Sequence, residues 1–172
     1  MSRPTVQQLI SHLQLEPLEG EGGLFRRTWL ASHALEPATL GAPYHEAKPL
    51  GSCIYYLLTE ESDSFSAFHR LPTDEIYHFY LGDPVTLFML DSHGVGEEIT
   101  LGHDLLHGQH VQYVVKGDKW QASILKEGGQ YALMGTTMAP AFTAGDFELG
   151  NRAELLAHYP THRDWITRLT RT

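Results

Sequence analysis

The sequence predicts an all-β protein, an antiparallel sandwich or barrel with helices at both ends of the chain. Three observations support this fold class. Short segments of alternating apolar and polar residues fill the middle of the chain, and turn-forming residues separate them at regular intervals. Helical periodicity, by contrast, is confined to the two terminal regions.

The first element expected is a helix close to the N-terminus. Its apolar residues fall at the i, i+3, i+4, i+7 spacing of one helix face, and they are Val6, Leu9, Ile10 and Leu13. Thr5 followed by Gln8 can form a capping box. Pro17 and the glycines of EGEGG, which follow directly, are expected to end the helix.

Period-two alternation then predicts a series of strands that are rich in aromatic and β-branched residues. The strands are expected at residues 24–30, 52–59, 64–71, 75–82, 85–90, 97–102, 109–116, 120–126 and 130–138. Turn sequences such as Leu81-Gly82-Asp83-Pro84 lie between them. After these strands, Asn151 with Glu154 and Thr161 with Asp164 indicate two C-terminal helices.

Composition limits the class of protein. A length of 172 residues without a linker or repeat predicts one domain, residues 1–172. The formal charge of −9 makes nucleic acid an unfavourable partner. A single cysteine excludes an internal disulfide framework and fits a reducing compartment. The sequence contains no apolar run that could span a bilayer and no signal-peptide core, so we expect a cytoplasmic protein without a membrane partner.

The stretch FHRLPTDEIYHFYLGD, residues 68–83, carries the clearest motif. It resembles the first motif of the cupins, in which a His-x-His pair is followed by three or four residues, a Glu, six residues and a Gly. His69, Leu71, Glu75 and Gly82 stand at those places. His69 and Glu75 therefore match the motif, whereas Leu71 replaces its second histidine.

The second cupin motif, Pro-x-Gly-x-x-His, is matched only at its glycine, because Val115, Gly117 and Trp120 stand in its three places. Most of the chain is similar to one cupin subfamily known only as a domain of unknown function, through residues 21–29, 66–83, 114–123 and 137–160. The resemblance implies an antiparallel β-barrel of the jelly-roll type, commonly a homodimer, related to deoxysugar-nucleotide epimerases and plant seed-storage cupins. It implies no particular reaction.

Metal binding is where the sequence departs most from the cupin pattern. Many cupins hold a divalent metal through three histidines and a glutamate, but Leu71 and Trp120 replace two of these ligands. His69 and Glu75 alone are too few, so no cofactor is predicted. The alternative is a metal-dependent oxygenase or isomerase that uses His69, Glu75 and His78. A bulge would have to turn His78 inward, since alternation places it on the opposite face from Glu75.

The predicted site is an aromatic-walled pocket around His69 and Glu75. If strands alternate strictly, Phe65 shares the face of His69, and Tyr77 and Phe79 share the face of Glu75. The full set of predicted ligand-binding residues is Phe65, Tyr77, His78, Phe79, Trp120, Gln121 and Arg70. An arginine that points inward, Arg26, Arg27 or Arg70, would bind a phosphate or carboxylate through two hydrogen bonds.

The sequence leaves the activity open among three possibilities. The first is metal-independent binding or epimerisation of a carbohydrate-like or nucleotide-linked small molecule, with His69 and Glu75 as an acid–base pair. The second is the metal-dependent enzyme described above. The third is a non-enzymatic ligand sensor or storage-type protein.

Overall fold

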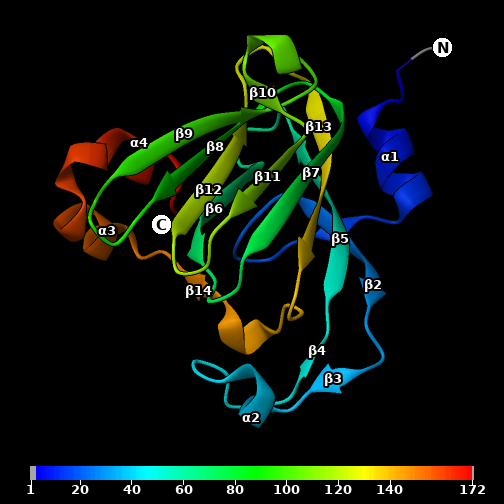
Figure 1. The fold of residues 1–172 in the computed structure, drawn as a ribbon. Helices are drawn as coiled ribbons and strands as arrows, with labels where there is room; N and C mark the ends of the chain where they lie inside the picture. The colour runs from blue at the N-terminus through cyan, green and yellow to red at the C-terminus, as the bar shows by residue number, and fades with distance from the viewer. Residues whose placement is uncertain (1–2, 172) are drawn as a thin grey trace.

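Two six-stranded sheets dominate the structure, a computed structural model that describes residues 3–171 (Figure 1). The first sheet has the order β1 (Glu16–Pro17), β2 (Leu24–Leu30), β5 (Ser52–Thr59), β13 (Tyr131–Met138), β7 (Glu75–Gly82) and β11 (Gln112–Val115). The second has the order β10 (Gln109–His110), β9 (Gly96–Leu101), β8 (Val85–Leu90), β12 (Trp120–Leu125), β6 (Phe65–Arg70) and β14 (Glu148–Leu149). The prediction of one domain also covers Met1, Ser2 and Thr172, which lie outside the described residues, and it stays a prediction.

The mostly-β architecture is confirmed, but the predicted closure into a barrel is wrong. Within residues 3–171, no strand of the first sheet pairs with a strand of the second. The sheets instead pack face to face as a sandwich. Their shared core contains Tyr56, Tyr77 and Phe79 from the first sheet and Leu87 and Met89 from the second.

The helices cover the two outer faces of this sandwich (Figure 1). The first, α1 (Val6–Leu13), lies on the first sheet, where Leu9 packs with Leu57 and Leu133. The C-terminal helices α3 (Arg152–His158) and α4 (Arg163–Arg168) lie on the second sheet. None of the helices in the described part of the chain has the length and apolarity needed to cross a membrane.

Two of the three predicted helix starts are confirmed. Thr5 and Gln8 form the capping box at the start of α1, and the Asn151 side chain accepts hydrogen bonds from the backbone at the start of α3. The start predicted from Thr161 is wrong by one residue, because the residue at the cap position of α4 is His162. The chain makes a 3₁₀ turn over Pro160–His162, so α4 begins at Arg163 without a side-chain cap.

The strand predicted at residues 109–116 is two strands that belong to different sheets. β10 pairs in parallel with β9, while β11 pairs antiparallel with β7. Val111 lies between them and accepts a hydrogen bond from the Phe79 amide at 2.7 Å. Alternation alone cannot reveal this change of sheet, because the side-chain pattern runs on through the crossing point.

A bulge in β6 decides which side chains face the interior. β12 pairs Gln121 with His69 and Ser123 with Ser66, so two β6 residues, Ala67 and Phe68, oppose one residue of β12. This extra residue reverses the alternation within the strand. Ser66 and His69 therefore lie on the inner face, and Phe68 packs against the C-terminal helices.

An arm extends from the sandwich at one end (Figure 1). It consists of the short strands β3 (Ala34–Leu35) and β4 (Lys48–Pro49) with the one-turn helix α2 (Pro37–Leu40) between them. Lys48 is buried and binds Asp146 at 2.8 Å, which ties the arm to the segment before β14.

Candidate functional site

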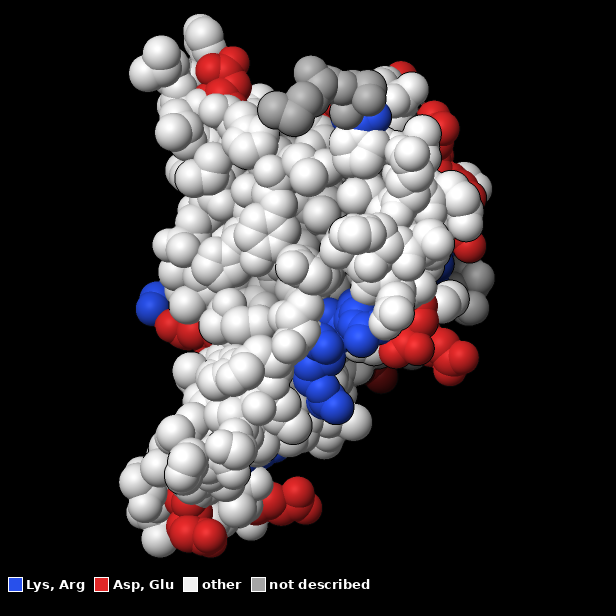
Figure 2. All heavy atoms as spheres, turned by 90° about the vertical axis from the view of Figure 1, so that its right-hand side faces the viewer, with Lys and Arg blue, Asp and Glu red and all other residues white. Residues whose placement is uncertain are grey.

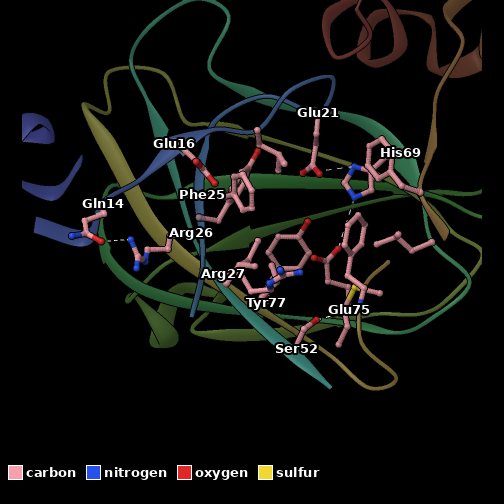
Figure 3. Close-up of a pocket in the computed structure, with 18 residues that line it drawn as sticks. Gln14, Glu16, Glu21, Phe25, Arg26, Arg27, Ser52, His69, Glu75 and Tyr77 are labelled. Carbon is pink, nitrogen blue, oxygen red and sulfur yellow. Dashed lines mark hydrogen bonds and ion pairs between the residues drawn. The ribbon is translucent and has the colours of Figure 1, made fainter. Parts of the chain in front are cut away.

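A cavity of about 460 Å³ lies between the first sheet and the β6 end of the second (Figure 3). Its lining residues come from β1, β2, β5, β6, β7 and β13, from the segments that flank β1 and follow β6, and from the segment before β14. They are Gln14, Glu16, Leu18, Glu21, Phe25, Arg26, Arg27, Ser52, Ile54, Tyr56, His69, Leu71, Glu75, Tyr77, Thr136, Met138, Phe142 and Phe147. A volume of this size accommodates a small organic molecule.

His69 lies between two carboxylates at the buried end of the cavity. Its Nε2 is 3.8 Å from Glu75 Oε2, and its Nδ1 is 4.0 Å from Glu21 Oε1. Nδ1 also lies 2.9 Å from the carbonyl oxygen of Ala67, to which it donates a hydrogen bond. The ring stacks on Phe147 with centroids 5.3 Å apart, so the imidazole is held on all sides.

Both carboxylates are fixed by neutral hydrogen-bond donors from the second sheet. Gln121 Nε2 donates to Glu75 at 2.9 Å, and Ser66 Oγ donates to Glu21 at 2.7 Å. Gln121 and Ser66 face inward because of the β6–β12 register described above. These donors carry no charge, so the positive charges beside the two carboxyl groups are those of His69 and of Arg171, which contacts the Glu21 backbone carbonyl at 3.2 Å.

This arrangement favours a charged imidazole. Burial disfavours the imidazolium, but the nearby carboxylates of Glu21 and Glu75 outweigh that effect and raise the pKa of His69 to about 9. Burial also raises the pKa of Glu21 above its ordinary value, although the charge of His69 acts in the opposite direction. At neutral pH the site therefore holds a buried proton on His69, within reach of two acids.

Glu21 is the residue of this site that sequence reasoning missed. It lies in the loop between β1 and β2, far in sequence from the FHRLPTDE motif, and the EGEGG stretch indicated only the end of a helix. Its backbone carbonyl accepts a hydrogen bond from the amide of Ala67 at 2.8 Å, which attaches the loop to the β6 bulge. A carboxylate inside a glycine-rich loop is the signal that could have identified it.

Gly22 is required for this loop to place Glu21. Its φ is +106°, and a Cβ would lie 2.3 Å from the carbonyl oxygen of Phe65. We expect Gly22→Ala to lower the free energy of unfolding by about 2 kcal/mol or more, because both the backbone and the contact are then strained. Chemical denaturation measures this change.

The matched control for that experiment is Gly145→Ala. Gly145 has an ordinary φ, and a Cβ there meets no atom within 4 Å. We expect it to change stability by less than about 0.5 kcal/mol. Equal effects at the two glycines would contradict the role given to Gly22.

The structure brings some of the other predicted site residues to the cavity. Tyr77 lines it beside Glu75, as alternation along β7 predicts, and Gln121 reaches it through its hydrogen bond to Glu75. Phe79 shares their inner face but does not line the cavity. It is buried in the core between the sheets and contacts His103 edge to face.

Three predicted ligand-binding residues lie on the opposite face of the second sheet. Phe65 and Trp120 pack with the C-terminal helices, and Arg70 lies over the Trp120 ring and pairs with Glu148. The common face predicted for Phe65 and His69 is wrong, because the bulge between them reverses the alternation. Trp120 faces outward because its neighbour Gln121 faces inward.

His78 also points away from the cavity. It lies on the outer face of β7, where its Nε2 is 3.0 Å from Thr137 Oγ1 and its ring stacks on Tyr80. Burial without a compensating charge lowers its pKa. No bulge turns the residue inward, so the geometry required for it to join His69 and Glu75 is absent.

The donor set at the cavity does not fit the metal centre that the cupin motifs imply. Leu71 lines the cavity at the place of one histidine, and Trp120 points out of it at the place of another. Among residues 3–171, no three His, Cys, Asp or Glu side chains are arranged to hold a metal ion. We therefore derive no chemistry through a metal in this site.

The open end of the cavity is positively charged. Arg26 and Arg27 line it from β2, and Figure 2 shows basic side chains gathered near the centre of the face that contains α1. Arg26 contacts Gln14, which follows α1, and Arg27 extends toward the middle of the cavity residues (Figure 3). Glu16 also lines the cavity on this side, so the mouth holds two arginines against one carboxylate. The buried end is built from Glu21, His69 and Glu75.

This two-sheet fold, with the first-motif His69 and Glu75 facing each other inside it, defines the protein as a cupin. The chain belongs to the family described as "Cupin superfamily (DUF985)", whose model matches residues 7–150. The resemblance seen in the sequence is therefore confirmed.

Solved structures agree with this assignment. The chain is 32% identical to a Shewanella oneidensis protein, with a TM-score of 0.86 and coverage of 98% of this chain and 99% of that one. It is 26% identical to a hypothetical protein from Leishmania major, with a TM-score of 0.88 and coverage of 98% and 100%. A dTDP sugar isomerase from Desulfovibrio desulfuricans, 15% identical, shares the fold with a TM-score of 0.53 and coverage of 85% and 83%. No curated protein matches the sequence significantly.

Proposed function

We propose that the protein binds a carbohydrate-like or nucleotide-linked small molecule in the cavity and catalyses its epimerisation or isomerisation without a metal. The observation that carries this proposal is the buried imidazole of His69 between the carboxylates of Glu75 and Glu21. Such a group can move a proton to and from a carbon beside a carbonyl. The dTDP sugar isomerase that shares the fold supports the proposal by analogy only.

The proposed step uses the acid and base in the charge states that the geometry favours. The Glu75 carboxylate removes a proton from the carbon beside the carbonyl, and the electrons of the C–H bond form an enolate. The imidazolium of His69 donates a hydrogen bond to the enolate oxygen, which stabilises the developing charge at the buried end of the cavity. Return of the proton to the opposite face of the same carbon gives the epimer. Return to the former carbonyl carbon gives the isomer, provided that the hydroxyl proton of the first carbon passes to the original carbonyl oxygen, a transfer that the imidazole of His69 can carry.

The aromatic part of the wall suits the remainder of such a ligand. Tyr56 and Tyr77 are almost fully buried, and Phe25 and Phe147 lie across the same cavity. Sugar rings and nucleobases stack favourably on such faces. Native mass spectrometry of freshly purified protein, searching for a co-purifying compound, tests the ligand class directly. A bound ligand with no carbonyl or hydroxylated ring would contradict the proposal.

We also propose that the protein is a homodimer. Four exposed apolar side chains surround Ser52 near the base of the arm, namely Trp29, Leu30, Leu50 and Phe142. Leu30 pairs with Ser52, and the amide of Phe142 donates to its hydroxyl at 3.1 Å, so the group is continuous. A second copy would remove this apolar surface from water.

Sedimentation tests the dimer. We expect the wild-type protein to sediment with the mass of two chains, and Leu30→Glu to shift it toward the monomer, because a buried charge opposes association. Lys126→Glu is a matched control, since it adds negative charge on an exposed residue outside the patch. A wild-type monomer at micromolar concentration would contradict the proposal.

A further inference from the structure

Two arginines at the mouth of the cavity indicate the charge of the ligand. The chain carries a formal charge of −9, yet the cavity mouth is lined by two adjacent arginines. Within residues 3–171, no carboxylate lies within 4.0 Å of Arg26 or Arg27, whereas Arg3, Lys48, Arg70, Lys116 and Lys119 all pair with acids. The other described basic residues without an acidic partner are Lys126, Arg152, Arg163, Arg168 and Arg171, and none of them lines the cavity. Arg26 contacts the Gln14 side chain, so the guanidinium of Arg27 is the more available of the two to an external anion.

The two arginines do not occupy equivalent positions. In the β2–β5 ladder Arg27 pairs with Ile54, which lines the cavity, and Arg26 pairs with Tyr55, which packs on the α1 side. Neighbouring residues of a strand face opposite ways, so Arg27 is the one directed inward. Figure 3 agrees, because the Arg26 side chain extends to Gln14 and that of Arg27 extends toward Tyr77.

The opposite end of the cavity disfavours an anion. Glu21 and Glu75 contribute two carboxyl groups there against the imidazole of His69, and the side chains that donate hydrogen bonds to them are neutral. Arg171 contacts the backbone carbonyl of Glu21 at 3.2 Å but does not line the cavity. A ligand with one anionic end would therefore enter with that end at Arg27 and its uncharged, hydroxylated part at His69. The charges that line the cavity thus favour one orientation of the ligand as well as a negative charge at one of its ends.

We infer that Arg27 is the anion-binding residue of the cavity and that the ligand carries an oxyanion, a phosphate or a carboxylate, at the end that lies in the mouth. This inference rests on the proposed function for the position of the reacting end. A guanidinium binds either oxyanion through two parallel hydrogen bonds. The two chemistries differ in charge, so they can be separated by experiment.

Isothermal titration calorimetry at low ionic strength tests the inference with three probes: pyrophosphate, thymidine diphosphate and glucuronate. We expect wild-type protein to bind at least one of them, with an affinity that falls as salt is added. Arg27→Gln should lower that affinity by about tenfold to a hundredfold, as expected for loss of a charge-assisted contact. Preference for the phosphorylated probes identifies a phosphate ligand, and preference for glucuronate a carboxylate.

Arg163→Gln is the control for net charge, because Arg163 is exposed at the start of α4, away from the cavity residues. It should leave the affinity within about twofold. The inference is overturned if wild-type protein binds none of the three probes, if Arg27→Gln and Arg163→Gln behave alike, or if Arg26→Gln has the larger effect. Calorimetry measures anion binding and does not require turnover. The inference about Arg27 can therefore hold even if the proposed proton transfer does not occur.

Discussion

Replacement of His69 with glutamine is expected to slow proton transfer strongly while the ligand still binds. The side chain would keep a hydrogen-bonding group between Glu21 and Glu75 but would carry neither an acidic proton nor a positive charge at neutral pH. Loss of a general acid typically lowers a rate by about 10²–10⁴-fold. Deuterium incorporation from solvent into the ligand, followed by proton NMR over a panel of hexoses, hexose phosphates and dTDP sugars, measures the rate.

His78→Gln is the matched control for this experiment. His78 belongs to the adjacent motif but lies on the outer face of β7 beside Tyr80 and Thr137. Metal-independent catalysis at His69 predicts little change in this variant, whereas a metal site that includes His78 predicts loss of activity in both. If the His69→Gln protein no longer binds the ligand and the wild-type protein exchanges no proton of any compound in the panel, the protein is a non-enzymatic sensor or storage protein and the proposed enzyme activity is wrong.

The second large effect expected is on stability as a function of pH. The pKa of His69 is about 9 in the folded protein and near 6.5 for an ordinary histidine, so the folded state binds this proton more tightly. The resulting stabilisation is complete below about pH 6.5 and is lost as the pH rises through 9. A difference of this size corresponds to about 3 kcal/mol at most.

Urea denaturation of wild-type and His69→Gln protein between pH 6 and 10 isolates this contribution. We expect the wild-type free energy of unfolding to fall relative to the variant over this range, mostly above pH 7. Groups remote from His69 titrate alike in both proteins and cancel in the difference. Curves that run parallel across the whole range would show that folding does not raise the pKa of His69.

Local patterns in the sequence were sufficient to predict most of the fold. Strands β2, β5, β7 and β8 have the predicted boundaries, because alternation and turn residues both mark them. Along β7 the alternation also gave the correct faces, with Glu75, Tyr77 and Phe79 inward and His78 outward. These features depend only on neighbouring residues, which is why one sequence is enough to predict them.

Features that depend on tertiary contacts were not predictable in this way. The β6 bulge changes the face of Phe65 without leaving a mark in the local pattern, since Ala67 and Phe68 both suit a regular strand. Glu21 joins the site only because its loop folds back onto β6. The separation into two sheets likewise depends on pairing between strands that are distant in sequence. The chain passes from one sheet to the other between β10 and β11, and no local pattern marks this change.

The β6 bulge has a consequence for the imidazole that it positions. Because the extra residue leaves the Ala67 carbonyl free to accept the Nδ1–H of His69, the proton on that nitrogen is retained and the other nitrogen is the one that ionises. Above its pKa, His69 is therefore the Nδ1–H tautomer, with a free lone pair on Nε2 directed at Glu75 and the cavity. One inserted residue thus sets which ring nitrogen can exchange a proton with a bound molecule.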